Sequence, residues 1–261
     1  MRSLTRHPLP EAAERWLEAR QSEVNRQPNP PTARLWEDHR PALNTCGVTK
    51  VLQDMVGPRE RCMYCGDSLA HTVDHFWPKS RYPGKMFVWD NLLWVCYPCN
   101  QKKGSQFPLD TSGAPLLLDP TATPDPWRHL FYVPETGEIV ARVDAQTGSE
   151  DPRGQATTDP RILPLNREAI THARRAAWRV LARAVLAFQN SAPLGAGESA
   201  LLSAFADCER PELVFWVLAH DGAREAPFAR LVGEHPALVT RLLHGAAPSS
   251  APTAPPRQVL F

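Results

Sequence analysis

The sequence predicts an α+β fold, in which a mainly helical chain surrounds a small core at residues 62–103. Two observations predict it. Before and after this stretch, apolar residues recur every three or four positions, which is typical of amphipathic helices. Inside it, two Cys-x-x-Cys pairs enclose short segments whose apolar and polar residues alternate, as in half-buried strands. The core would therefore be a small strand-and-helix unit fastened at its two cysteine pairs.

The composition is that of a globular chain without a strong overall field. Its 261 residues carry a net charge of +1, and 43% of them are hydrophobic. A near-neutral chain does not attract a polyanion globally, so any contact with nucleic acid must use local patches. No apolar run reaches the roughly 20 residues of a membrane span, and the N-terminus carries no secretory signal. We expect a cytoplasmic protein that makes no membrane contact.

The chain divides into segments by composition. The five segments are 1–56, helical and expected to dock a partner; 57–110, the core; 111–165, acidic and loop-rich with a hairpin; 166–245, helical; and 246–261, an Ala/Pro/Ser-rich tail expected to be disordered. Basic and acidic residues nearly cancel in the first segment, which suits packing or docking better than binding DNA.

Helix starts in the first segment are predicted from proline and threonine. Pro10 can open the first helix, and Thr32 and Thr49 can cap two more. Residues 27–31 form a proline-rich linker between the first two. We therefore expect three short helices before the core.

Later elements are predicted from turn signals and periodicity. Residues 132–133 and 139–141 flank a Pro-Glu-Thr-Gly-Glu turn and predict a hairpin. The acidic segment around it is read as solvated loop or as a partner surface. A long helix is expected from Asn166, as N-cap, to Gln189, and Pro211 and Pro236 open shorter ones.

The long helix also carries arginines at every fourth position. Arg175, Arg179 and Arg183 form a stripe away from its apolar face. Such a stripe could follow a nucleic-acid backbone, bind an acidic partner or face water, and exposed arginines on an amphipathic helix mostly face water.

The cysteine spacing indicates structural zinc. Cys62 and Cys65 form one pair and Cys96 and Cys99 the other, so four thiolates can surround one tetrahedral ion with no open position. A single pair could be redox-active, but two pairs within forty residues favour zinc. Thirty residues separate the pairs, more than in a plain zinc ribbon, so an insert with another function lies between them.

The insert reads as strand, loop, strand and helix. Residues 72–76 alternate as a strand does, and residues 78–84 hold prolines and a glycine typical of a loop. A second apolar run ends at residue 95, and Pro98 suits the first turn of a helix. So short an insert buries little apolar surface, so the zinc ion must supply much of its stability.

Three residues of the insert suggest hydrolysis of a phosphodiester. His75 is a natural general base, and Asp74 and Asn100 offer oxygen ligands to a hard cation such as Mg²⁺. Neighbouring strand residues point to opposite faces, so Asp74 and His75 need a local bend to share a site. A lone Asp-His pair would more often be a surface accident, but here it comes with Asn100 and the zinc pairs.

In order and spacing, these motifs resemble the HNH endonucleases of the ββα-metal class that carry a four-cysteine zinc site. The matching elements are Cys-x-x-Cys, Val-Asp-His-Phe-x-Pro-Lys-Ser, Asp-Asn-Leu and Val-Cys-x-x-Cys-Asn-x-x-Lys. The resemblance implies a catalytic Mg²⁺ or Mn²⁺ on Asp74 and Asn100, with His75 as general base. It also implies that Asn91 braces the loop that holds His75.

The resemblance further implies phosphate contacts from Lys103 and Lys102, which we place near the first turn of the helix. Cations there oppose the helix dipole, and a bound phosphate would relieve the conflict. Lys79, Arg81 and Lys85 could extend this basic track, although each alone could equally be a solvated side chain.

Phrases outside the motif resemble the PtuB nuclease subunits of Septu-type anti-phage defence systems. They are Lys-Gly-Ser-x-Phe-Pro-Leu, Leu-Leu-Asp-Pro and the later Leu-Asn-Arg. The resemblance implies a DNA endonuclease that acts beside an SMC-like or ABC-type ATPase. A non-catalytic, zinc-stabilised nucleic-acid-binding or assembly module is the alternative, and an RNase using the same site is a third possibility.

Overall fold

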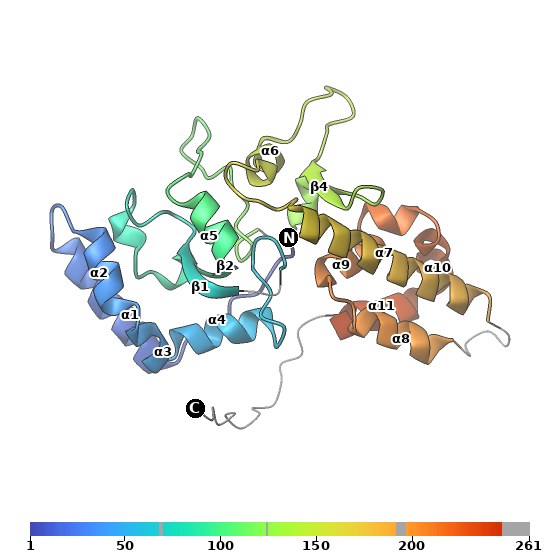
Figure 1. Cartoon of the computed structure of the whole chain (residues 1–261), viewed down its shortest axis with the longest axis horizontal. Helices are drawn as coiled ribbons and strands as arrows, with labels where there is room; N and C mark the ends of the chain where they lie inside the picture. The colour runs from blue at the N-terminus through green and yellow to red at the C-terminus, as the bar shows by residue number, and fades with distance from the viewer. Residues whose placement is uncertain (68–69, 124, 192–196, 247–261) are drawn as a thin grey trace.

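The structure, a computed structural model, describes residues 1–67, 70–123, 125–191 and 197–246. Figure 1 shows two helical groups on either side of the small sheet that carries the Asp-His pair. The first group contains α1 (Glu11–Asn25), α2 (Thr32–His39), α3 (Ala42–Thr45) and α4 (Val48–Val56). The second contains α7 (Glu168–Gln189), α8 (Glu198–Ala206), α9 (Pro211–Ala219), α10 (Phe228–Glu234) and α11 (Pro236–Ala246). The α+β class is confirmed.

The first helical group departs from the sequence signals at both threonines, and it contains a fourth short helix, α3, that they do not predict. Helix α1 begins directly after Pro10, as predicted, whereas Thr32 is the first residue of α2 and Pro31, not Thr32, is its N-cap. Helix α4 is not capped by Thr49, which lies inside it. Its N-cap is Gly47, whose φ of 96° lies in the left-handed region that glycine adopts without steric cost. A glycine turn therefore replaces the expected side-chain cap.

The central unit is a two-stranded antiparallel sheet followed by a helix. Strand β1 (Ala70–His75) pairs with β2 (Leu92–Cys96), and all five residues of β2 are buried. Helix α5 (Tyr97–Lys103) begins immediately after β2. Single-turn 3-10 helices η1 (Pro83–Lys85) and η2 (Trp89–Asn91) lie in the connection between the strands. This is the expected order of strand, loop, strand and helix.

The position of Lys102 and Lys103 in helix α5 differs from the prediction that they lie near its first turn. Because the helix starts at Tyr97 and ends at Gly104, which has a φ of 46°, Lys102 and Lys103 fall in its last turn rather than near its first. Cations in the last turn are favoured by the helix dipole. The dipole conflict that we expected a phosphate to relieve is therefore absent from this helix.

The predicted hairpin is confirmed as β3 (Leu130–Val133) and β4 (Glu138–Ala141), preceded by η3 (Pro126–Arg128) and followed by α6 (Pro152–Thr158). Asn166 does not cap α7, whose N-cap is Arg167. The Asn166 side chain instead bonds the hairpin: Oδ1 accepts from Ile139 N at 2.9 Å, and Nδ2 donates to Ile139 O at 2.8 Å. The hairpin is thereby tied to the start of α7.

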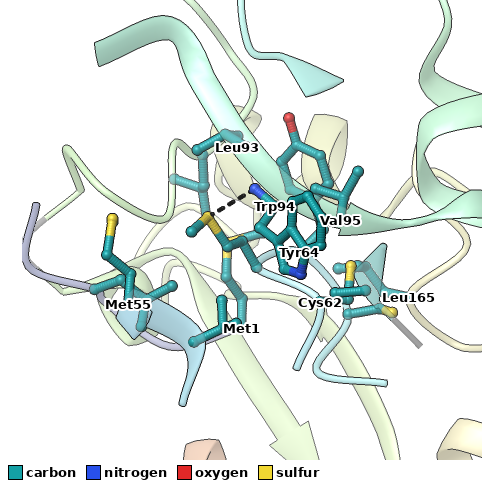
Figure 2. Packing of buried hydrophobic residues seen from close by; sticks show 14 of the residues in the cluster. Met1, Met55, Cys62, Tyr64, Leu93, Trp94, Val95 and Leu165 are labelled. Atoms are coloured by element: carbon teal, nitrogen blue, oxygen red, sulfur yellow. Dashed lines mark hydrogen bonds between the residues drawn. The ribbon is translucent and has the colours of Figure 1, made fainter. Parts of the chain in front are cut away.

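Buried side chains from all these regions belong to one hydrophobic cluster. Figure 2 shows Met55 of α4, Tyr64 beside the first cysteine pair, Trp94 of β2 and Leu165 near α7 in one packed group. Helix α9 contributes buried side chains to the same cluster, and the short η4 (Asp221–Arg224) follows it in the chain. The helical first segment is therefore packed onto the core. The expected disordered tail lies outside the described residues, apart from Ala246 at the end of α11.

None of the helices in the described ranges combines the length and apolar character that crossing a membrane requires.

Candidate metal centre and nuclease site

The four paired cysteines meet at one point in the interior. The Sγ atoms of Cys62, Cys65, Cys96 and Cys99 all lie within 4.8 Å of one another, and all four residues are buried. Cys65 Sγ and Cys96 Sγ are 3.7 Å apart. Sulfurs bound to one tetrahedral zinc at about 2.3 Å are roughly 3.8 Å apart, so the cluster fits the ion. None of these cysteines forms a disulfide.

Two arginines from the C-terminal half support this cluster. Arg167 Nη2 lies 3.9 Å from both Cys65 Sγ and Cys96 Sγ and bonds Asp67 Oδ2 at 2.8 Å. Arg210 Nη1 donates to the carbonyl oxygen of Gly66 at 2.9 Å. Four thiolates around Zn²⁺ carry a net charge of −2, which a neighbouring guanidinium offsets. These contacts link the cysteine cluster to the second helical group.

Asp74 is held by two buried partners. Its carboxylate Oδ2 accepts from the Tyr64 hydroxyl at 3.0 Å and pairs with Lys103 Nζ at 3.1 Å. Lys103 Nζ also donates to the carbonyl oxygen of His75 at 2.6 Å and is 3.4 Å from Asp74 Oδ1. Both stronger contacts fall on Oδ2, so Oδ1 is the more available oxygen for a cation.

His75 is a neutral, buried imidazole. Its Nε2 lies 3.0 Å from Met86 O, and since a carbonyl only accepts, Nε2 carries the proton and Nδ1 the lone pair. Its ring packs edge-on against Trp36 of α2, with centroids 4.3 Å apart. Burial, and then the charges of Lys79 and Lys103, lower the pKa of His75 to about 3. The ring therefore stays in its neutral form, with the proton on Nε2, throughout the neutral pH range.

Asn91 spans the loop next to His75. Its Oδ1 accepts from Trp77 N at 2.6 Å, while Nδ2 donates to Trp77 O at 3.0 Å and to Lys85 O at 2.8 Å. Both ends of the loop after β1 are thus bound to one side chain. Met86, whose carbonyl oxygen binds His75, follows Lys85 directly. These are the contacts that a brace for the His75 loop requires.

Asn100 faces β1 from the first half of α5. Its Nδ2 donates to Thr72 Oγ1 at 3.2 Å, and among the residues that the structure describes no hydrogen bond involves the amide oxygen Oδ1, which can act as a ligand. Asp74 lies two residues after Thr72 on the same strand, so both face α5. A carboxylate and an amide oxygen suit Mg²⁺ or Mn²⁺, which keep several waters when bound by few protein ligands. The residues present therefore fit a hard divalent cation.

A cavity of about 580 Å³ brings three of the predicted residues together. Asp74, His75 and Asn100 all line it. Strand β1 ends at His75 and the chain bends at Phe76, which supplies the local bend that two neighbouring strand residues need to share a site. Asn91 does not line this cavity; it lines a different one and contacts the loop after β1 through its hydrogen bonds to Trp77 and Lys85.

The lysines are arranged differently from our expectation. Neither Lys102 nor Lys103 lines the cavity, and the Lys103 side chain is 0% exposed. Its ammonium is used by Asp74 and His75, so it is out of reach of a phosphate in this structure. Of the loop cations, Lys79 lines the cavity, whereas Arg81 donates to Phe107 O at 3.2 Å and Lys85 lies over the Trp77 ring.

Sequence reasoning missed several residues of the site. Tyr64 lies between Cys62 and Cys65 in the sequence. This position beside two metal-binding cysteines was the one signal that could have identified it as a residue of the site. Trp36 and Arg40 belong to the segment we assigned to partner docking, yet they line the cavity. Nothing in local spacing connects them to Asp74, because their approach depends on how the first helical group packs.

The Arg175, Arg179 and Arg183 stripe lies on α7, in the second helical group, and does not line the cavity (Figure 1). Arg175 is half-buried and the other two arginines are exposed.

Comparison with known proteins agrees with this geometry. Residues 62–106 match a family described as HNH endonuclease. A 76-residue region is 36% identical to the Septu protein PtuB of Bacillus thuringiensis. That alignment covers 27% of this chain and 28% of the relative, so the chain spans under a third of the curated relative it matches. The chain therefore carries an HNH endonuclease region with a four-cysteine cluster.

Proposed function

We propose that this chain is a metal-dependent HNH endonuclease that hydrolyses phosphodiester bonds of DNA. We further propose that it is the nuclease effector of a Septu-type anti-phage defence complex with an ATPase subunit. The main support is one arrangement: His75 has its Nε2 proton fixed on Met86 O, and it lines one cavity with Asp74 and Asn100. A neutral imidazole thus lines the same cavity as two side chains that can offer oxygen ligands to a cation.

The side chains have separate tasks in this proposal. His75 accepts a proton from the attacking water through Nδ1, since Nε2 is already bonded. Asn91 holds the loop that contains the Met86 carbonyl, which keeps the ring in one orientation. Tyr64 and Lys103 make their shorter contacts with Asp74 Oδ2, which leaves Oδ1 as the more available oxygen.

A divalent cation held by Asp74 and Asn100 would neutralise charge at the scissile phosphate and its leaving oxygen. Lys102, exposed at the end of α5, remains a candidate for a phosphate contact outside the cavity. The four cysteines would hold structural zinc, which fixes the strand-helix unit around these groups.

The proposed partner is an SMC-like or ABC-type ATPase, supported by the similarity to a Septu protein. The proposed compartment is the cytoplasm, where a reducing environment keeps the four clustered thiols available for zinc. Co-expression with a candidate ATPase and co-purification of the two chains tests the partnership directly.

Plasmid nicking tests the catalytic proposal. The native chain with Mg²⁺ or Mn²⁺, with and without the ATPase, should convert supercoiled plasmid to open circles, and His75→Ala should not. A matched RNA substrate in the same assay separates a DNase from an RNase. Equal cleavage by native and His75→Ala proteins would remove His75 from the mechanism. Nucleic-acid binding without cleavage in every condition would favour the non-catalytic module.

A further inference from the structure

The cavity over the catalytic residues has a wall that the matched HNH region does not supply. Trp36, Glu37 and Arg40, from α2 and its C-cap, line it together with Asp74 and His75. These α2 residues lie outside the region 62–106. Figure 1 shows α2 and α3 on the same side of the molecule as β1 and α5. The first helical group therefore completes the site.

Two cations line the cavity, Arg40 on this wall and Lys79 on a loop of the matched region. Lys79, from the loop after β1, places its ammonium 5.7 Å from the centre of the Trp36 ring. No ion pair within 4.0 Å involves this ammonium among the residues that the structure describes. Burial lowers the pKa of Lys79, and the neighbouring Asp74 and Glu37 raise it in part. An anion entering the cavity would meet a half-buried cation with spare donors.

Arg40 faces the same space with only a weak internal partner. Its Nη2 lies 3.1 Å from Glu37 Oε2, one turn earlier, and the two side chains are 58% and 59% exposed. Exposed pairs of this kind contribute only about 0–1 kcal/mol, so a phosphate can displace Glu37 at little cost. A guanidinium also binds phosphate oxygens with two parallel hydrogen bonds.

We propose that Arg40 and Lys79 bind the phosphodiester backbone of the substrate strand next to the scissile bond, in the role that the sequence motif predicts for Lys103. The proposal rests on the proposed nuclease function and names the residues that hold its substrate. Glu37 is the carboxylate that phosphate displaces from Arg40. The first helical group is thus a substrate-binding wall of the active site.

Salt-dependent binding tests the proposal separately from catalysis. Fluorescence anisotropy of a labelled DNA oligonucleotide is measured with the full chain, without added Mg²⁺ or Mn²⁺, across a range of salt concentrations. Arg40→Gln and Lys79→Met should each weaken binding about tenfold. Each should also reduce the salt slope by about 1, the value for one lost phosphate contact. Arg40→Lys should restore part of the affinity, and Glu37→Gln should tighten binding.

Matched controls come from the same two elements. Arg34→Gln removes a more exposed charge from α2 that does not line the cavity, and Lys85→Met removes a loop cation that does not line it either. Neither should change the slope. Equal slopes for Arg40→Gln, Lys79→Met and the controls would overturn the proposal, as would no binding by the native chain. His75→Ala should bind like the native chain without nicking, so lost catalysis and lost binding are distinguishable.

Discussion

Lys103 Nζ lies 3.1 Å from Asp74 Oδ2, and the Lys103 side chain is 0% exposed. The ammonium is the buried counter-charge of the carboxylate that we propose as a metal ligand. A lysine that the sequence motif associates with phosphate therefore has an internal structural task in this chain.

Removing this ammonium should destabilise the fold. Lys103→Met leaves Asp74 buried without its partner, and breaking a buried ion pair in this way costs roughly 3–5 kcal/mol. Added Mn²⁺ should recover part of the loss, because a cation on Asp74 restores the missing charge. Urea unfolding with and without Mn²⁺ measures both effects. Lys102→Met, on the exposed side of α5, is the control, and equal stability of the two variants would contradict the prediction.

Tyr64→Phe should loosen Asp74 without removing charge. The variant loses the hydroxyl that donates to Asp74 Oδ2, and a buried hydrogen bond of this kind contributes about 1–2 kcal/mol. We expect a matching loss in urea stability and weaker Mn²⁺ binding by calorimetry. Tyr82→Phe, in a ring that packs on Trp77, serves as comparison. Unchanged Mn²⁺ affinity in Tyr64→Phe would show that the hydroxyl does not position the carboxylate.

Asn91→Ala should slow nicking while the protein stays folded. It removes three hydrogen bonds between Asn91 and the loop from Trp77 to Lys85, so the carbonyl that orients His75 is released. Misplacing a catalytic group by about 1 Å can cost on the order of 100-fold in rate. Single-turnover nicking and zinc content are measured together. Asn190→Ala, at the exposed C-cap of α7, should leave both unchanged, and native-like nicking by Asn91→Ala would exclude the brace.

The core should depend on zinc. Cys99→Ser removes one of four clustered ligands, and in so small a unit the metal supplies much of the folding free energy. We expect zinc near one equivalent in the native chain and a large loss in the variant, together with a lower melting temperature. Cys46→Ser, at a cysteine outside the cluster, should change neither. A full equivalent of zinc in Cys99→Ser would refute the four-cysteine site.

Stability should also depend on pH through His75. Burial, then Lys79 and Lys103, lower its folded pKa to about 3, whereas the unfolded value is about 6.5. Between these values the unfolded chain binds a proton that the folded chain does not, so stability rises with pH in this window. The contribution is at most about 1.4 kcal/mol per pH unit. The difference in urea stability between native protein and His75→Gln should vary with pH below 6.5 and be flat above it.

The local parts of this site are predictable from sequence. The cysteine spacing, the alternation around Asp74 and the helix after Pro98 depend on contacts within a few residues, and each appears in the structure. The contact between Trp36 and His75 depends on the packing of α2, and no local pattern encodes it. The burial of Lys103 was missed for a similar reason, since a lysine near a helix end is normally solvated.

Helix boundaries likewise separate into those set by local residues, which the sequence predicts, and those set by distant contacts, which it does not. Prolines marked the starts of α1, α9 and α11, because a proline fixes its own φ. Asn166 was wrongly expected to cap α7, since its side chain is used by the distant residue Ile139 instead. A polar side chain with two possible partners cannot be assigned from its neighbours in sequence.

The edge-on contact between Trp36 and His75 limits which fragment of the chain can be transplanted with the proposed site intact. The matched region 62–106 contains the proposed base and metal ligands but not the ring that packs on the base. Grafting that region alone onto another scaffold would transfer the motif without its enclosing wall. The smallest portable unit that keeps the proposed site enclosed therefore begins before α2.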